Sequence, residues 1–421
     1  MSDRSSLRSS SALYEPDRHE SLIAVAWDEA AAGAAIEAIA LAARTDFSEQ
    51  YLWPIHPLDR SPERPAGALK PLFNGAAGVV WGLQRLAAMG AIAPARDFRS
   101  VVAGLLARQH EDDIQLGREP SHAFPIGDTG LLMLAWTAEP SEAIALQLHG
   151  AIAAASSNSA LGFVWGAAGA LLAACFMYER TADERWRTQF NTIADLLWVH
   201  WQYEPELGGH HMQQTLYGHT DRQLCALHGL AGMVFALHRG EQLTSGLRSA
   251  NERNGELVRR SYAVFKHTAV RAGAFANWPM LVGPSTRPTA AVRLLQHCIG
   301  APGVITCLAG MPAGIDDDMD ALLLGAGELV WHAGPTIKLP SLCHGAAGSG
   351  YAFLKLFKRT GDERWLVRAR RFAMHGIAQA ERAAHVYGQR KHSLWTGDIG
   401  LAIYLQDCLR AHAEVPLMDV F

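Results

Sequence analysis

Two cysteines and a histidine stand directly before two copies of the same short glycine motif. Cys298 lies two residues before Gly300 of one Gly-x-x-Gly sequence, and Cys343 and His344 lie directly before Gly345 of another. Thiolate and imidazole groups are ligands that zinc prefers, and three protein ligands leave one position of a tetrahedral ion open to a substrate. These residues form a candidate catalytic metal site if the fold brings the two copies together.

Each of these thiols has a simpler explanation when it is considered alone. Free cysteines are often buried as small hydrophobic residues. Four other cysteines lie within largely apolar segments and keep that interpretation: Cys175, Cys225, Cys307 and Cys408. The N-terminal stretch lacks the apolar core of a signal peptide, so we expect free thiols and a cytoplasmic location.

The glycine motif occurs seven times, each time between apolar residues. Its first glycines are Gly75, Gly127, Gly166, Gly229, Gly300, Gly345 and Gly397. One copy alone carries no information, but seven copies with similar flanks indicate a repeat architecture. Segments that are apolar on all sides follow the motifs, and amphipathic segments separate them. This pattern predicts buried inner helices that alternate with outer helices.

The repeats favour a closed ring over an open solenoid. An open solenoid needs polar terminal repeats, whereas the last copy of the motif is nearly as apolar as the middle ones. We therefore predict an all-α fold, an (α/α)7 toroid, that is, a double ring of helices built from the seven repeats. A single domain of residues 21–421 would follow a flexible N-terminal tail of residues 1–20.

The composition excludes several classes of function. Hydrophobic residues make up 49% of the chain and charged residues 19%, which is enough for a large core. With a formal net charge of -4, no basic surface for nucleic acid or an anionic membrane is expected. The uncharged stretch 160–178 approaches the length of a membrane span, but it contains a glycine motif and is better explained as a buried helix.

In a closed ring, the residues just before each glycine pair would converge on the centre. The fourth to sixth copies carry every histidine and cysteine of this set. His228, in the fourth copy, is therefore a candidate for proton transfer, because imidazole is the side chain best matched to neutral pH. A hydrogen-bonded core histidine is the alternative.

These motifs resemble the lanthionine synthetase C-like family. The likeness covers about residues 50–410 and rests on residues 227–232, 298–303, 343–345 and 395–402. The resemblance implies an α/α toroid with a central Zn2+ ion held by Cys298, Cys343 and His344. It also implies an activity, the Michael addition of a thiol to dehydroalanine or dehydrobutyrine, which forms a lanthionine-type thioether.

The implied partners follow from this activity. A peptide dehydrated by a separate dehydratase could be cyclised through its own cysteine, or a peptide or protein carrying dehydroamino acids could receive glutathione. The resemblance places His228 at the acid/base position of the family. Arg293, five residues before Cys298, is a candidate for stabilising the enolate oxygen, and a surface arginine is the alternative.

The chain departs from the family pattern at three positions. Members often have an acidic residue where this chain has Gly162, an aromatic residue where it has His297, and Tyr or His where it has Ile299. The missing acid keeps a second function open, a zinc-containing peptide-binding module or pseudoenzyme. A zinc hydrolase is a third hypothesis, weakened because two thiolates reduce the Lewis acidity of the metal.

Overall fold

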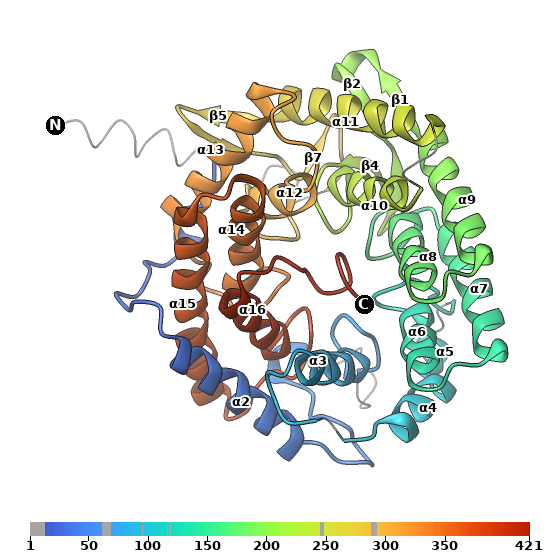
Figure 1. The fold of residues 1–421 in the computed structure, drawn as a ribbon, viewed down its shortest axis with the longest axis vertical. Coiled ribbons are helices and arrows are strands. Elements are labelled where there is room, and N and C mark those ends of the chain that lie inside the picture. Colours follow the sequence, from blue (N-terminus) through green and yellow to red (C-terminus); the bar gives the residue numbers. More distant parts are fainter. Residues whose placement is uncertain are drawn as a thin grey trace.

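The chain forms a double ring of helices, which Figure 1 shows in a view down the ring axis of the computed structural model. The structure describes residues 13–60, 69–94, 96–115, 117, 119–244, 248–287 and 293–421. Seven inner helices begin directly after the first glycines of the motifs: α3 (Ala76–Ala88), α6 (Asp128–Ala138), α8 (Ala167–Thr181), α10 (Leu230–Leu243), α12 (Ala301–Leu308), α14 (Ala346–Thr360) and α16 (Asp398–Arg410).

Seven outer helices alternate with the inner ones along the chain: α2 (Glu29–Thr45), α4 (Arg99–Ala107), α7 (Glu142–Ser156), α9 (Glu184–His200), α11 (Arg248–Thr268), α13 (Asp317–Ala333) and α15 (Glu363–Tyr387). The short helix α5 (Glu111–Gln115) follows α4. Each inner helix contacts the next, and the last, α16, contacts the first, α3, so the ring closes. The prediction of an (α/α)7 toroid is confirmed.

Burial follows the predicted pattern of inner and outer helices. Every residue from 167 to 177 of α8 is buried, as expected for a helix that is apolar on all sides. The outer helix α15 instead buries one face, which includes Trp365, Ala369 and Phe372. Among the described residues, no helix is long and apolar enough to cross a membrane.

The structure also contains short strands and 3-10 helices. Two antiparallel hairpins are formed by β1 (Trp201–Glu204) with β2 (Gly209–Met212) and by β5 (Val270–Ala272) with β6 (Phe275–Asn277). A three-stranded sheet has the order β3 (Gln214–Leu216), β4 (His219–Gln223) and β7 (Leu281–Val282). The 3-10 helices are η1 (Pro16–Arg18), η2 (Pro57–Asp59) and η3 (Pro205–Leu207).

The glycines are required by close backbone packing at the start of each inner helix. In all seven motifs, a Cβ on the second glycine would collide with the carbonyl oxygen of the residue six positions earlier, as for Gly232 with Ala226 and Gly348 with Leu342. The first glycines meet the backbone six positions earlier in the same way, as for Gly345 with Leu339. Each loop therefore folds back over the beginning of its own helix.

Backbone hydrogen bonds join neighbouring motifs around the ring. They connect the residues two positions before the first glycines, with N···O distances of 2.8–3.1 Å: Cys298 to Cys343, Cys343 to Trp395, Trp395 to Phe73, Phe73 to Pro125, and Val164 to Leu227. The series cannot continue from Pro125 as a donor because proline has no N–H. The loops that carry the site residues are thus held in register by the main chain.

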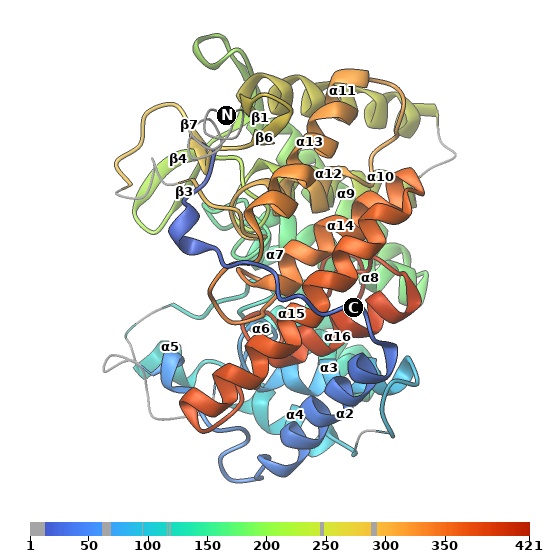
Figure 2. The ribbon, with the colours of Figure 1, turned by 90° about the vertical axis from the view of Figure 1, so that its left-hand side faces the viewer.

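The C-terminal segment, residues 411–421, closes one end of the ring. It ends near the ring axis in Figure 1, and Leu417 and Met418 are fully buried. Lys355 of α14 forms an ion pair with Asp419 at 2.6 Å, and Arg180, near the end of α8, donates a hydrogen bond to the carbonyl oxygen of Phe421 at 2.7 Å. In Figure 2 this segment lies across the ring from β3, β4 and β7. The glycine motifs, at the beginnings of the inner helices, lie toward the other end.

Residues 13–20, which the sequence analysis assigned to a flexible tail, lie against the ring. Leu13 is fully buried, and its carbonyl oxygen accepts a hydrogen bond from Asn277 Nδ2 at 2.7 Å. Glu20 pairs with His375 of α15 at 2.7 Å. The packed part of the chain thus includes residue 13, while residues 1–12 lie outside the described residues.

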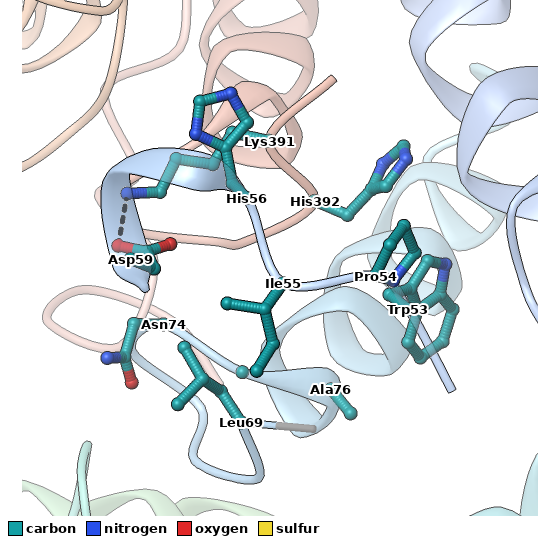
Figure 3. A pocket seen from close by; sticks show the side chains of 11 residues that line it. Trp53, Pro54, Ile55, His56, Asp59, Leu69, Asn74, Ala76, Lys391 and His392 are labelled. Atoms are coloured by element: carbon teal, nitrogen blue, oxygen red, sulfur yellow. Dashed lines mark hydrogen bonds and ion pairs between the residues drawn. The ribbon is translucent and has the colours of Figure 1, made fainter. Parts of the chain in front are cut away.

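The first and last repeats meet beside the hollow drawn in Figure 3. Lys391, which precedes the seventh motif, forms an ion pair with Asp59 of η2 at 2.7 Å. Its neighbour His392 lies with Nε2 at 2.7 Å from a carboxylate oxygen of Asp46. Removing one partner of a buried ion pair leaves an uncompensated charge and destabilises the fold. These contacts therefore stabilise the closed ring. Asn74 of the first motif lines the same hollow, which is separate from the predicted metal ligands.

We expect Gly232→Ala to lower the free energy of unfolding by about 1–3 kcal/mol, because the new methyl group meets a backbone carbonyl that cannot move aside without shifting the loop. Gly150→Ala, in the outer helix α7 with open space around it, is the matched control. It should raise stability by up to about 1 kcal/mol, because alanine favours a helix interior. Urea unfolding of both variants measures the difference, and equal effects would contradict the packing argument.

Candidate metal centre and proton-transfer site

Cys298, Cys343 and His344 lie close enough to bind one ion. Their two sulfur atoms and one imidazole nitrogen are all within 4.8 Å of one another. Sulfur ligands of a tetrahedral zinc ion lie roughly 3.8 Å apart, so a small movement of side chains would complete the site. Within the described part of the chain, no other group of three His, Cys, Asp or Glu residues meets this distance criterion.

The turns position the three side chains. The N–H of Cys298 donates to the carbonyl oxygen of Cys343 at 2.9 Å, so the two sulfur-bearing residues are adjacent across two repeats. The hydroxyl of Thr336 donates to the carbonyl oxygen of His344 at 2.9 Å. Helices α12 and α14 begin three residues after Cys298 and Cys343, respectively, and the positive ends of their dipoles favour thiolate charge there.

The two thiols affect each other strongly without a metal. The hydrogen bond that the thiol of Cys298 makes to Cys343, followed by burial, raises the pKa of Cys298 well above its ordinary value. Two thiolates this close repel, and a bound cation removes the repulsion while it takes the place of the protons. The soft donor set and its proximity thus fit zinc, although the role of these residues as zinc ligands stays a prediction.

His228, the predicted proton-transfer residue, stands on the fourth turn with an enclosed ring nitrogen. Its Nδ1 atom is buried and has no hydrogen-bond partner among the described residues. Burial lowers the pKa of His228 to about 4, and the positive charge of Arg287 contributes in the same direction. The imidazole is therefore neutral at physiological pH and can accept a proton.

The position of Gly162 has a packing explanation. A Cβ at this residue would lie 2.7 Å from the Cα and the carbonyl carbon of His228, so no side chain fits there without moving the fourth turn. The side-chain oxygen of Gln214 in β3 accepts hydrogen bonds from the N–H groups of Leu161 (2.8 Å) and Gly162 (3.2 Å). Its amide group also donates to the carbonyl oxygen of His228. An amide thus ties the third turn to the fourth.

His297 keeps an aromatic contact at the second position where the chain departs from the family pattern. It is buried, and its ring meets that of Trp395 edge-on, with the centroids 5.3 Å apart. Burial lowers the pKa of His297 to about 3, so the imidazole is neutral and packs as an aromatic ring. The residue directly before Cys298 thus makes an aromatic contact with Trp395.

Two arginines are candidates for stabilising the enolate oxygen, the role that the sequence analysis gave to Arg293. Arg293 is half-buried, and no hydrogen bond or ion pair joins it to another described residue. Arg287 instead forms an ion pair with the fully buried Asp221 and donates to the carbonyl oxygen of Leu216 at 2.7 Å. Sequence reasoning missed Arg287 because it stands outside every repeated motif. The assignment of Arg293 to the enolate stays a prediction.

Sequence comparison places the chain among known proteins. The model of the family described as lanthionine synthetase C-like protein matches residues 118–419. The chain belongs to the lanthionine synthetase C-like family. The zebrafish (Danio rerio) protein named glutathione S-transferase LANCL1 is 32% identical over 46% of this chain and 45% of its own length. The Arabidopsis thaliana LanC-like protein GCL1 is 33% identical over 26% of each chain.

Comparison of structures agrees on the fold of this LanC-like chain. The solved structure of nisin cyclase superposes with a TM-score of 0.54, covering 81% of this chain and 88% of that chain at 12% sequence identity. At this identity the likeness supports the toroid alone. The chain spans less than half the length of the two curated relatives it matches, so their activities are not transferred to it directly.

We expect Cys343→Ala to lose zinc, because two ligands alone hold the ion weakly and the third thiolate cannot be replaced by a methyl group. Elemental analysis of the purified protein measures the metal-to-protein ratio. Cys175→Ala, which alters a fully buried thiol inside α8, should keep the wild-type ratio. A full zinc complement in Cys343→Ala would contradict the proposed ligand set.

We expect the imidazole of His228 to titrate far below pH 6.5, with a midpoint near pH 4. The unfolded chain binds this proton with a pKa of about 6.5, so protonation favours unfolding. The contribution of His228 therefore makes the protein progressively less stable as the pH falls from about 6.5 toward 4. NMR of labelled histidines, assigned through a His228→Gln variant, gives the midpoint directly. A midpoint near 6.5 would show that the site is open to solvent.

Proposed function

We propose that this chain catalyses the zinc-dependent addition of a thiol to dehydroalanine or dehydrobutyrine in peptides or proteins. The observation that supports this most is the meeting of two thiols and an imidazole at adjacent turns of a LanC-like toroid. The ring is closed at its other end by residues 411–421, so a substrate would approach from the end with the glycine motifs.

The substrate pair comes from the chemistry and from the names of related proteins. One relative is named a glutathione S-transferase and the structural neighbour a nisin cyclase, which supports a thiol as one reactant and a peptide as the other. Both intramolecular cyclisation and the addition of glutathione belong to the proposal. Cyclisation would require a separate dehydratase to prepare the peptide, and the location we propose is the cytoplasm.

Each residue of the site would have its own role in the proposed thiol addition. Cys298, Cys343 and His344 would hold a zinc ion, which favours the thiolate form of a bound thiol. The neutral imidazole of His228 accepts the proton that the thiol loses, because its pKa of about 4 leaves it unprotonated at neutral pH. After sulfur has bonded to the β-carbon, the same imidazole returns the proton to the α-carbon.

A peptide-binding module without turnover is the second candidate. The observation in its favour is Gly162, where the contact with His228 excludes the acidic side chain that related proteins often carry. In this case zinc would organise the turns, and dehydroamino-acid peptides would bind without reacting. Turnover measurements separate the two candidates.

We expect the zinc-loaded protein to join glutathione to a short peptide that contains one dehydroalanine, as followed by mass spectrometry. A second peptide that also carries a cysteine would report cyclisation through the loss of its alkylatable thiol at unchanged mass. His228→Asn should slow either reaction by about 10²–10⁴-fold, the usual contribution of a general acid–base residue.

The matched control is His149→Gln, which changes a histidine on the outer helix α7 and should leave the rate unchanged. If the wild-type protein does not exceed the uncatalysed rate with either peptide, the enzyme proposal fails. Binding of the same peptides to the zinc-loaded protein would then support the module.

A further inference from the structure

Tyr217 occupies an unfavourable backbone conformation at the tip of the hairpin β3–β4. Its φ of 54° lies in the left-handed region, and the following Gly218 has a φ of 74°. Two-residue hairpin turns of this kind favour asparagine or glycine at both positions, so a tyrosine is placed there at a conformational cost. Strained backbone conformations of this kind cluster at functional sites, which points to a function of the Tyr217 side chain.

The hairpin that carries Tyr217 is anchored on both sides of the strained residue. Gln214 binds the third and fourth turns, and the carbonyl oxygen of Leu216 accepts a hydrogen bond from Arg287 at 2.7 Å. The N–H of Thr215 also donates to the carbonyl oxygen of Ser159 at 3.0 Å. These contacts fix the backbone at the tip, so the tyrosine ring is presented in one direction.

The hydroxyl of Tyr217 has an unused hydrogen. The indole Nε1 of Trp165 lies 2.7 Å from this oxygen, and an indole N–H can only donate. The phenolic hydrogen must therefore point elsewhere, and no acceptor for it is found within the described part of the chain. A hydroxyl that accepts one hydrogen bond becomes a better donor of another.

Tyr217 stands beside the proton-transfer histidine. The rings of Tyr217 and His228 meet edge-on with their centroids 6.2 Å apart, and the rings of Tyr217 and Trp165 are perpendicular at 5.7 Å. As a residue, Tyr217 is 62% exposed, so a peptide at this surface can reach it. Partial burial of the phenol raises the pKa of Tyr217, which keeps its proton in place at neutral pH.

We propose that Tyr217 is a catalytic residue whose hydroxyl donates a hydrogen bond to the carbonyl oxygen of the dehydroamino acid. This inference rests on the proposed thiol addition. The sulfur electron pair forms the bond to the β-carbon, the π pair of the alkene becomes a double bond between the α-carbon and the carbonyl carbon, and the π pair of the carbonyl moves onto its oxygen. The proton that His228 took from the thiol then goes to the α-carbon, and the carbonyl bond re-forms.

Tyr217 keeps its own proton throughout this sequence. Its hydrogen bond strengthens as negative charge collects on the oxygen, so the transition state gains more than the bound substrate does. The hairpin thereby brings a donor to a site where Gly162 leaves no room for an acidic side chain. Trp165 would act as a positioning residue, since it orients the hydroxyl without touching the substrate.

Tyr217→Phe, which removes only the hydroxyl, tests this role in the zinc-loaded full chain. With glutathione and a short dehydroalanine peptide as probes, we expect kcat to fall by about 10²-fold, the order found when one oxyanion donor is removed. The KM for glutathione and the zinc content should stay as in the wild type. Trp165→Phe should produce a smaller fall in kcat, because the hydroxyl remains but loses its orienting partner.

Tyr203→Phe, at an exposed tyrosine of β1, is the matched control and should keep the wild-type kcat. A wild-type kcat in Tyr217→Phe would overturn the proposal. If Tyr217→Ala then raised the KM for the peptide, the ring would be a binding surface instead. Absence of turnover in the wild type would be a failure of the proposed function, and a loss of zinc or of helical circular dichroism in Tyr217→Phe would show a structural role, which also overturns the proposal.

Discussion

The close contact between each motif glycine and the backbone six residues earlier is the constraint on which this structure depends. No side chain fits at these positions, so every loop folds tightly over the first turn of the helix that follows it. Adjacent loops then come near enough to exchange backbone hydrogen bonds, including the one between Cys298 and Cys343. The predicted metal ligands are therefore adjacent because two main chains are paired, and their side chains would need only small adjustments to share an ion.

The same contact explains which parts of the structure could be predicted from the sequence. Glycines at fixed spacing beside apolar segments are a local signal, so the inner helices, the ring and the convergence of Cys298, Cys343 and His344 could all be predicted. Arg287 could not, because its place beside the hairpin depends on the pairing of β4 with β7, which are far apart in the sequence. The contact of Tyr217 with His228 could not either, because it depends on how the hairpin β3–β4 packs against the fourth turn. Residues 411–421 carry no motif either, and their burial depends on specific partners such as Lys355 and Arg180.

The missing acid is a consequence of packing and changes the electrostatics of the site. Gly162 lies so close to the backbone of His228 that the third and fourth turns are joined by the amide of Gln214 rather than by a charged group. The charged side chain on the other side is Arg287, which is neutralised in part by the buried Asp221. The histidine thus has a cation near it.

In the proposed reaction, the burial of His228 and the neighbouring Arg287 would favour rapid return of the proton. A carboxylate beside a histidine stabilises the imidazolium and makes it a reluctant acid, whereas burial and a neighbouring arginine destabilise it. With a pKa of about 4, protonated His228 is a strong donor once it has taken the proton of the thiol. The thiol must then be acidified by its own site, because so weak a base removes a proton only from a group whose anion is already stabilised. Two thiols and an imidazole that fit a zinc ion lie on the two turns that follow His228, and a zinc ion held there would supply that stabilisation.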